Sequence, residues 1–503
     1  MIVVNSARVI GRSICVIQIA LLVAGCYSGA LLADSTANCR ITPPIPAVPS
    51  TAKTYSHRSG TDDTAGIQQA LDGLQTGDWL VLPAGTYNIS QHLTVLASGV
   101  TLYGAGATIH SSSATDGAIW IKSDNVAVYG FTLQQDSKSR QSTPWAGGIC
   151  VYDDRGAGSR TVRGAVIQNN TVNNSAAVGI FILNVENFTV ANNTVWRSWA
   201  DGIHMTGGAF SGRVINNTVS QNGDDMIAVV SYASSPKPAP AALNYANWPA
   251  VQAGLDRNIY IAGNSVSNQY WGRGISVVGG SYVTIANNNV SLTPGAAGIY
   301  LARETAYMTF GDHNILVSDN TVSQIETTAP SYQPVNNNMV LSGQGAIEVA
   351  STMYSDEYAN PTWRQAFSMS DIAVLNNSVS HTQFAGIRLG LGSSGSGTAK
   401  ASDGSTLTQT WLPGPVQNLT VKGNNLAEVK SAGVIDAYSG LDATTISCSD
   451  NTLNGVPWTT KCTSTVTGSS ATATVSGASV QCTANGILDL SVSPKVPTLV
   501  PVN

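Results

Sequence analysis

The sequence is poor in charged and aromatic residues. Of its 503 residues, 11% are charged and 7% are aromatic. This low charge argues against a coiled coil or an ordinary helical enzyme. There is no excess of basic residues either, since 24 Lys and Arg stand against 29 Asp and Glu. A nucleic-acid partner is therefore not expected, because phosphate binding needs a basic face.

Long apolar runs are also missing. The apolar stretch 13–23 is too short to span a bilayer, and no later segment is longer. It follows Arg8 and Arg12, an arrangement typical of a signal peptide. The next residues, Val23-Ala24-Gly25-Cys26, resemble a bacterial lipobox. We therefore predict a signal peptide over residues 1–25, with lipidation of Cys26 as the only link to a membrane.

The residue after Cys26 is Tyr27 rather than Asp, which favours sorting to the outer membrane of a two-membrane cell. The alternative is ordinary cleavage after Ala30 or Ala33, giving a secreted or periplasmic protein. In both cases the protein leaves the cytoplasm. Residues 26–55, rich in Pro and Ser from residue 40 onward, are expected to form a tether.

Cysteine is scarce, with seven residues in the chain. No Cys-x-x-Cys spacing is present, so the sequence gives no support for a zinc site. An oxidising compartment permits disulfides. Cys448 and Cys462 are the preferred pair because both lie near the C-terminal end. The Ser/Thr-rich residues 456–503 are expected to form a tail or cap.

Glycine is abundant, with 49 residues, and a short phrase recurs along the chain. Its first copies begin at Asn170, Asn193 and Asn217, so the repeat is about two dozen residues long. The copies are Asn170-Thr171-Val172, Asn193-Thr194-Val195, Asn217-Thr218-Val219, Asn264-Ser265-Val266, Asn288-Asn289-Val290, Asn320-Thr321-Val322, Asn377-Ser378-Val379 and Asn451-Thr452-Leu453.

A second phrase runs in step with the first, as in Gly179-Ile180-Phe181-Ile182 and Gly202-Ile203-His204-Met205. Each repeat therefore holds short strands of period two, separated by Asn and Gly turns. Such a repeat fits one coil of a parallel β-helix, with the recurring Asn forming an inward ladder. Leucine-rich repeats are the competing solenoid, but their leucine signature is absent.

An open solenoid end exposes strand edges and needs a cap. Residues 64–75 are expected to form a capping helix, begun by Asp62 or Asp63 and apolar on one face. The segment Gly60-Thr61-Asp62-Asp63-Thr64, this helix and Leu82-Pro83-Ala84-Gly85-Thr86-Tyr87 resemble the opening of pectin-lyase-like proteins. That resemblance implies an all-β chain, a single right-handed parallel β-helix over residues 56–455 with an N-terminal capping helix.

One column of the aligned coils carries charge. The residue before the Gly-Ile phrase is small or apolar except in three consecutive coils, where it is Asp201, Asp225 and Arg273, with Asp224 beside Asp225. Carboxylates on adjacent coils repel, so at least one pKa must rise. One protonated acid and one ionised base are what glycoside hydrolysis needs.

The coils that carry Asp201, Asp224, Asp225 and Arg273 resemble the polygalacturonase family of glycoside hydrolases, in its Asn-Thr-Asp-Gly, Asp-Asp, Gly-His-Gly and Arg-Ile-Lys motifs. The resemblance implies inverting hydrolysis, with Asp224 as the general acid and the other two aspartates activating water. Three departures stand out: Trp199-Ala200 replaces Asn-Thr, Arg273 replaces His, and Tyr300-Leu301-Ala302 replaces Arg-Ile-Lys. True polygalacturonase activity is therefore not expected.

Arg273 also supports an alternative reaction, that of a polysaccharide lyase. Several β-helix polysaccharide lyases use an arginine as base beside bound calcium, and Asp201, Asp224 and Asp225 offer oxygen ligands for that ion. Lyase or epimerase chemistry on an acidic glycan therefore stays open, as do a plain ion pair between Arg273 and Asp225 and a non-catalytic glycan-binding solenoid. The hydrolase itself needs no cofactor.

Further residues are expected to contact a polysaccharide substrate. His204, Glu348 and Arg388 share an outward column, two positions after the Gly. The others are Trp199, two residues before Asp201, and Tyr300 and Arg303, in the coil that follows Arg273.

Overall fold

The computed structural model describes residues 38–57, 62–155, 160–233, 254–327, 341–391, 395–400, 406–431, 434–436, 446–458, 477–478 and 480–489. The expected signal peptide, Cys26 and Cys462 lie outside these ranges. Within them, no helix combines the length and the apolar character that crossing a bilayer requires.

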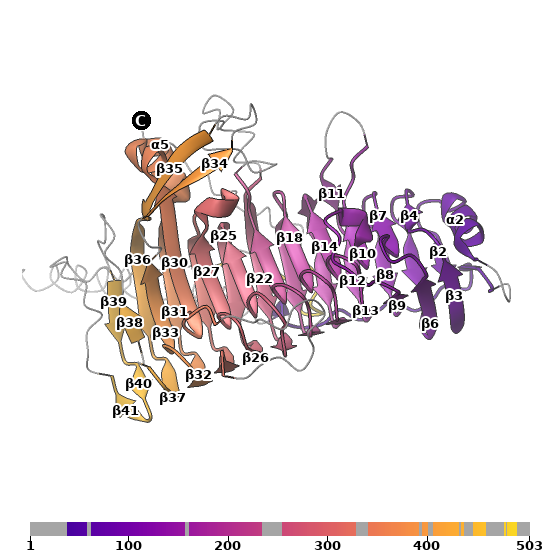
Figure 1. Ribbon diagram of the computed structural model, residues 1–503. Coiled ribbons are helices and arrows are strands. Elements are labelled where there is room, and N and C mark those ends of the chain that lie inside the picture. The colour runs from indigo at the N-terminus through magenta and orange to yellow at the C-terminus, as the bar shows by residue number, and fades with distance from the viewer. Residues whose placement is uncertain are drawn as a thin grey trace, which may run out of the picture.

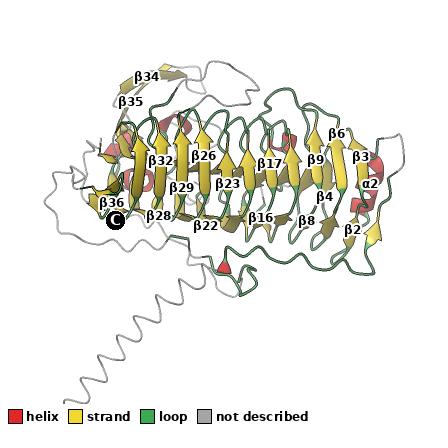
Figure 2. Cartoon of the chain, turned by 90° about the horizontal axis from the view of Figure 1, so that it is seen from below, coloured by secondary structure: helices red, strands yellow, loops and turns green. Residues whose placement is uncertain are grey.

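The chain winds into a parallel β-helix, as the repeats predict (Figure 1). Most coils contribute one strand to each of three sheets, which we name A, B and C and which contain 15, 13 and 13 strands within the described residues. Seen from below, the strands of successive coils lie side by side along the whole body, and helices are few (Figure 2).

Sheet A consists of β1 (Lys53–Thr54), β2 (Trp79–Val81), β5 (Thr101–Tyr103), β8 (Ala127–Tyr129), β11 (Val162–Arg163), β12 (Val166–Gln168), β15 (Val185–Glu186), β16 (Thr189–Ala191), β19 (Phe210–Ile215), β22 (Asp256–Ala262), β25 (Gly280–Ala286), β28 (His313–Ser318), β31 (Met369–Leu375), β36 (Val416–Lys422) and β39 (Ile446–Ser449). Sheet B consists of β3 (Gly85–Ile89), β6 (Ala107–Ser111), β9 (Thr132–Gln135), β13 (Thr171–Asn173), β17 (Thr194–Trp196), β20 (Thr218–Ser220), β23 (Ser265–Ser267), β26 (Asn289–Thr293), β29 (Thr321–Ile325), β32 (Ser378–Thr382), β37 (Asn425–Val429), β40 (Thr452–Leu453) and β41 (Val456–Pro457). Sheet C consists of β4 (Leu93–Val95), β7 (Ile119–Ile121), β10 (Ile149–Val151), β14 (Ile180–Leu183), β18 (Ile203–Thr206), β21 (Ile227–Val230), β24 (Ile275–Val278), β27 (Ile299–Arg303), β30 (Ile347–Tyr354), β33 (Ile387–Leu391), β34 (Gly395–Lys400), β35 (Thr406–Pro413) and β38 (Val434–Asp436).

The core follows from the period-two pattern. In sheet C, Ile180 pairs with Ile203, which pairs with Ile227, and all three side chains are fully buried. Val and Ile at such positions suit strands because their branched side chains pack on a pleated surface. Each buried side chain of this size contributes about 1.5–3 kcal/mol. One continuous hydrophobic column therefore runs through the solenoid.

The recurring asparagines form the predicted inward ladder. Asn193 Nδ2 donates to Asn217 Oδ1 at 3.0 Å, and Asn217 Nδ2 donates to Asn264 Oδ1 at 2.9 Å. The residue before each ladder position has a left-handed backbone, for example Asn216 at φ 55° and Gly263 at φ 68°. Asn, Asp and Gly tolerate that conformation best, which explains the Asn-Asn, Asp-Asn and Gly-Asn pairs in the sequence. The ladder runs through Asn170, Asn193, Asn217, Asn264, Asn288, Asn320, Asn377, Asn424 and Asn451.

The N-terminal cap is the helix α2 (Thr64–Asp72), shorter than expected because Gly73 ends it. Asp62 Oδ1 accepts a hydrogen bond from the backbone N–H of Thr64 at 2.9 Å, whereas the carboxylate of Asp63 makes no capping bond. The buried face of the helix, Ile67 and Leu71, covers the first coil.

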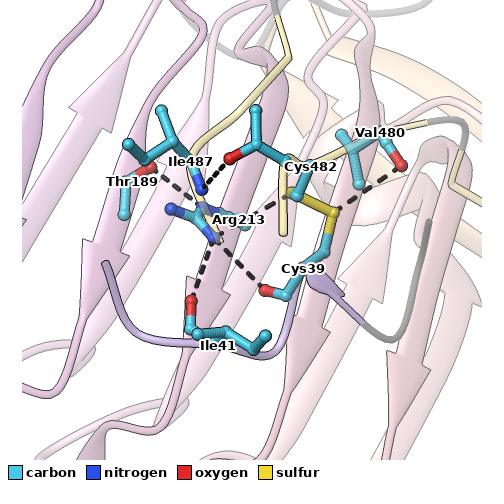
Figure 3. The surroundings of a disulfide bond; sticks show 8 residues. Cys39, Ile41, Thr189, Arg213, Val480, Cys482 and Ile487 are labelled. Carbon is cyan, nitrogen blue, oxygen red and sulfur yellow. Dashed lines mark hydrogen bonds between the residues drawn. A yellow bond between two sulfur atoms is a disulfide. The ribbon is translucent and has the colours of Figure 1, made fainter. Parts of the chain in front are cut away.

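The expected tether is corrected by the structure, because its described part is docked on the solenoid. The strand β1 extends sheet A, and Cys39 is fully buried in a disulfide with Cys482 (Figure 3). Arg213 Nη1, beneath this bridge, donates to the carbonyls of Cys39 and Ile41 at 3.4 and 3.3 Å. The tail is likewise docked, since Ala478 and Val480 pack against the middle strands of sheet A. The amino-acid composition of these two segments does not reveal their docking, because it depends on the apolar contacts of Ala478 and Val480 and on the disulfide between Cys39 and Cys482.

The disulfide between Cys39 and Cys482 was not expected from the sequence. Cys448 is also disulfide-bonded. Its expected partner, Cys462, lies outside the described residues, so that pairing stays a prediction.

The insertion after β30 builds a small lobe from α4 (Ser355–Ala359) and α5 (Pro361–Phe367). The hairpin of β34 and β35 pairs antiparallel with β30 beside it. In Figure 1 this lobe projects above one end of the solenoid, on the side away from α2.

Candidate active site

The outer face of sheet C carries one outward column of side chains in register. The predicted grouping of His204, Glu348 and Arg388 in one column is correct. The full column reads Thr94, Trp120, Cys150, Phe181, His204, Ala228, Ser276, Tyr300, Glu348 and Arg388.

The charged column lies at the N-terminal ends of three adjacent strands of this sheet. The N–H of Gly202 donates to the carbonyl of Asp225 at 3.0 Å, and the N–H of Met226 donates to that of Arg273 at 3.0 Å. Asp201, Asp225 and Arg273 therefore occupy successive coils in register, as the aligned Gly-Ile phrases predict.

Asp224 and Asp225 point toward the same turn. A Cβ placed on Gly272 would lie 2.7 Å from Oδ1 of Asp224 and 2.5 Å from Oδ1 of Asp225. Gly272 also has φ 79°, which glycine adopts without strain. The third coil thus has a glycine where both carboxylates need room.

Asp225 is the most enclosed of the three acids, with its side chain 7% exposed. Its Oδ1 accepts the backbone N–H of Arg273 at 2.6 Å, and its Oδ2 accepts the hydroxyl of Ser276 at 2.5 Å. Burial raises the pKa of Asp225 to about 7, against the lowering effect of the Arg273 charge, and the neighbouring aspartates raise it further. This carboxyl therefore retains a proton in weakly acidic solution.

Asp224 is more accessible, with its side chain 26% exposed. Burial raises its pKa first and the charge of Asp201 second, while Arg140 opposes both. Arg140 Nη1 lies 2.8 Å from Asp224 Oδ2. The most exposed acid is thus held by a cation from a distant loop.

Asp201 is paired with a histidine of its own strand. The Nδ1 of His204 lies 2.6 Å from Asp201 Oδ2, and both side chains are almost buried. Burial lowers the pKa of His204, but the Asp201 carboxylate outweighs it and the net pKa is raised. The pair holds the Asp201 carboxylate in one orientation.

Arg273 is held between acids and an aromatic ring. Its Nη2 lies 2.8 Å from Glu304 Oε1, its Nη1 lies 3.9 Å from Asp225 Oδ1, and its guanidinium sits 4.2 Å above the ring of Tyr300. Burial lowers the pKa of Arg273, but Asp225 and Glu304 outweigh it and the net pKa is raised. Arg273 is therefore fixed in its charged form.

Arg303 does not contact substrate, which corrects its expected role. Its side chain is 0% exposed and its Nη2 lies 2.7 Å from Glu357 Oε1. Its other nitrogens donate to the carbonyls of Thr309 and Thr352. Arg303 is the last residue of β27, and its guanidinium lies against Glu357 of α4 and 4.8 Å from the ring of Phe367 in α5.

The other expected substrate contacts lie on the same face but differ in accessibility. Glu348 is buried against Arg388 at 3.2 Å, and burial raises its pKa to about 7. Tyr300 is 6% exposed beneath Arg273. Trp199 is half-buried, and its indole N–H donates to Asn174 Oδ1 at 3.1 Å. Of these, Trp199 and Arg388 retain open surface.

Several residues near the acids were not singled out from the sequence. Arg140 comes from the loop between β9 and β10, and no repeat position marks it. Ser276 stands in the column, where its small side chain gives no signal. Asp256 opens β22, is fully buried, and accepts the backbone N–H groups of Gly208 and Ala209 at 3.0 and 2.6 Å. Burial raises its pKa to about 7.

Exposed aromatic rings surround the acids. Trp271 is 51% exposed, Tyr307 44% and Tyr232 37%. Trp271 precedes the Gly272 turn, Tyr307 ends the short helix η4 (Thr305–Tyr307), and Tyr232 lies close enough to Asp201 for that charge to raise its pKa, after burial. In the described ranges, no three His, Cys, Asp or Glu side chains are grouped so that they could hold a metal ion.

Comparison with protein families gives one match, in which residues 98–237 fit the family described as right handed beta helix region. Among curated proteins, none matches this chain.

Solved structures of similar shape include enzymes of the same architecture. The catalytic domain of Agl-KA is 17% identical, with a TM-score of 0.54 over 83% of this chain and 67% of that chain. A GH87 α-1,3-glucanase catalytic domain in complex with nigerose is 17% identical, with a TM-score of 0.53 over 82% and 67%. The A-module of a mannuronan C-5 epimerase, AlgE6 of Azotobacter vinelandii, is 15% identical, with a TM-score of 0.48 over 78% and 95%. The chain thus has the pectin-lyase-like right-handed parallel β-helix fold.

Proposed function

We propose that this chain is an exported glycoside hydrolase that cleaves a polysaccharide on the outer face of sheet C. The observation that carries the proposal is the carboxylate cluster of Asp201, Asp224 and Asp225, in which the pKa values of Asp224 and Asp225 are raised. Coupled acids of this kind keep a proton on one carboxyl while another is ionised. The shared fold with an α-1,3-glucanase supports the choice of a glycan as substrate.

Asp224 is the proton donor to the leaving oxygen in this proposal. It is the most exposed of the three acids, at 26% against 12% for Asp201 and 7% for Asp225. Substrate that displaces Arg140 would remove a cation that lowers the pKa of Asp224. The carboxyl would then keep its proton until the glycosidic oxygen accepts it.

Asp201 and Asp225 orient the attacking water. Asp201 is ordered by His204, and Asp225 is ordered by Ser276 and by the backbone of Arg273. A proton removed from water passes to an ionised carboxylate, so one member of this pair must be charged. Attack by water directly, with no covalent intermediate, inverts the anomeric carbon.

The environment of Arg273 favours hydrolysis over lyase chemistry. A base must be able to lose its proton, but Asp225 and Glu304 raise the pKa of this guanidinium. In the hydrolase, Arg273 instead holds Glu304 and steadies Asp225.

The charges of the site favour a neutral glycan. Arg140 and Arg273, which lie closest to the acids, are already paired with Asp224 and Glu304. Neither is positioned to bind a uronate carboxylate without breaking an ion pair. The open rings of Trp271, Tyr307 and Tyr232 suit the C–H faces of uncharged sugars.

Export and lipid anchoring through Cys26 complete the proposal, and they rest on the leader sequence alone. Metabolic labelling of the full chain with a radioactive fatty acid tests them. Label that persists in a Cys26→Ser variant would contradict the anchor.

The hydrolase is tested on a panel of soluble and insoluble glucans, xylan, polygalacturonate and alginate. We expect new reducing ends without new ultraviolet absorbance, and an inverted anomer in the first NMR spectra. An unsaturated, absorbing product would replace the hydrolase by a lyase, and binding without any product would leave a glycan-binding solenoid.

A further inference from the structure

A second aromatic cluster lies on the same sheet, away from the acids. Trp145, in the short helix η1 (Pro144–Ala146), is 40% exposed. Its indole stacks on that of Trp120, with ring centroids 5.8 Å apart and an interplanar angle of 20°. One face of Trp145 is thus supported by protein while the residue keeps a large open surface.

The supporting ring is itself fixed. Trp120 is 5% exposed, its indole N–H donates to the carbonyl of Tyr152 at 2.7 Å, and it also stacks on the ring of Tyr152 at 6.2 Å. The ammonium of Lys122 lies 3.7 Å from the centre of the Trp120 ring and 2.8 Å from Asp154. Tyr152 and Lys122 therefore hold the Trp120 indole in place, and this support for Trp145 is formed before a ligand binds.

The cluster is aligned with the acid site. Trp120 and His204 stand in the same outward column, with Cys150 and Phe181 between them. Three strand-to-strand steps separate them, or roughly 14 Å along the solenoid. Phe181 is half-buried and its ring lies 5.6 Å from that of His204. Trp120 and His204 are thus joined by one column of mostly apolar side chains, and Figure 1 shows the four strands β7, β10, β14 and β18 side by side.

The loop that carries Trp145 also reaches the acids. Residues 136–148 connect β9 to β10, and Arg140 in this loop pairs with Asp224. The N–H of Gln141 donates to the carbonyl of Ala176 at 2.7 Å, so the loop leans over the next coil. The distal aromatic ring and the acid-bound arginine therefore belong to one loop beside sheet C.

We propose that Trp145, supported by Trp120, is a distal sugar-binding subsite that takes an uncharged pyranose ring of the same glycan, stacked on the open indole face. This subsite rests on the proposed function for its substrate class. It fixes the direction of the glycan along the solenoid axis and makes binding depend on chain length. Stacking of a sugar requires an aromatic ring whose orientation is fixed before binding, and Trp120 supplies that support for Trp145.

The subsite is tested in the full chain with Asp224→Asn as background, so that binding is measured without turnover. Native gels are cast with carboxymethyl α-1,3-glucan, pullulan, xylan or polygalacturonate. We expect at least one neutral polymer to retard Asp224→Asn, and the added Trp145→Ala change to weaken that binding about tenfold.

Trp196 provides the matched control, because it is a half-buried indole with Arg197 4.5 Å above its ring but lies in β17 on sheet B. Adding Trp196→Ala should leave the retardation unchanged. Equal retardation with and without Trp145, or no retardation by either neutral polymer, pullulan or xylan, overturns the subsite. The proposed function fails separately, if the wild type releases no reducing ends while binding that depends on Trp145 persists.

Discussion

Arg140 Nη1 lies 2.8 Å from Oδ2 of Asp224, the most exposed acid of the cluster, although the two residues belong to different coils. The arginine comes from a loop, and half of its side chain is exposed. A substrate can therefore displace it without disturbing the β-helix. The ion pair thus links the charge of the proposed proton donor to the presence of substrate.

Replacing Arg140 by Ala should raise the pKa of Asp224, because the lost cation favours the ionised carboxylate. A general acid works while protonated, so the alkaline limb of the pH profile of kcat/KM should move to higher pH. Since the pair is partly exposed and screened, we expect a shift of roughly 0.2–0.7 pH unit. Initial rates across pH measure it, and an unchanged or lowered limb would contradict the pairing.

Replacing Asp224 by Asn should reduce hydrolysis by at least about 100-fold, the usual contribution of a general acid, while glycan binding persists. The amide keeps the shape of the carboxyl but cannot supply its proton. Asp450→Asn is the matched control, because Asp450 is 68% exposed on the last coils. Full activity in Asp224→Asn would remove this residue from the mechanism.

Replacing Arg273 by Lys should leave measurable activity. The lysine keeps the positive charge near Glu304 and Asp225 but loses the planar fork and the stacking on Tyr300. The cost is about 1–3 kcal/mol in ΔG‡.

Hydrolysis should also survive EDTA. If chelation stops the reaction, calcium restores it and an absorbing product forms, then Arg273 is the base of a lyase and the three aspartates are metal ligands.

Replacing Asn264 by Ala should destabilise the fold by about 3 kcal/mol or more. The change removes the acceptor of Asn217 Nδ2 and the donor to Asn288 Oδ1, and each buried polar group left unpaired costs about 1–3 kcal/mol. Thr218→Ala, at an exposed position beside the ladder, is the control. Urea unfolding measures both, and equal midpoints would show that the ladder does not stabilise the solenoid.

The free energy of unfolding should fall as pH rises from about 4 to about 7, because of the buried carboxyl of Asp256. Burial raises its folded pKa to about 7, so in this window the unfolded chain has released a proton that the folded chain retains. One such proton is worth about 1.4 kcal/mol per pH unit. Asp256→Asn keeps the group neutral and should reduce the slope by that amount in urea titrations. An unchanged slope would mean that Asp256 is ionised in the folded protein.

The sequence predicts the fold and the acid column well because both depend on a repeated local pattern. The phrases that begin at Asn217 and Gly202 recur about every two dozen residues. When the coils stack in register, Asp201 therefore lies beside Asp225. Arg140 and Trp145 could not be placed in the same way, since a loop outside the repeat carries them. The burial of Arg303 depends on the lobe of α4 and α5, which the coil alignment does not contain. The docking of Cys39 depends on a partner at the other end of the sequence.

The bridge between Cys39 and Cys482 determines how the molecule responds to pulling. Cys39 and Cys482 are both packed against the middle strands of sheet A, far from its first and last coils. Force applied to the chain N-terminal to residue 38 is therefore transmitted to the middle coils of the solenoid, perpendicular to the axis along which the coils stack. The terminal coils do not lie in that line of force, so they would not be peeled away one at a time. In the proposed lipid-anchored enzyme, the outer face of sheet C would therefore keep its shape under tension.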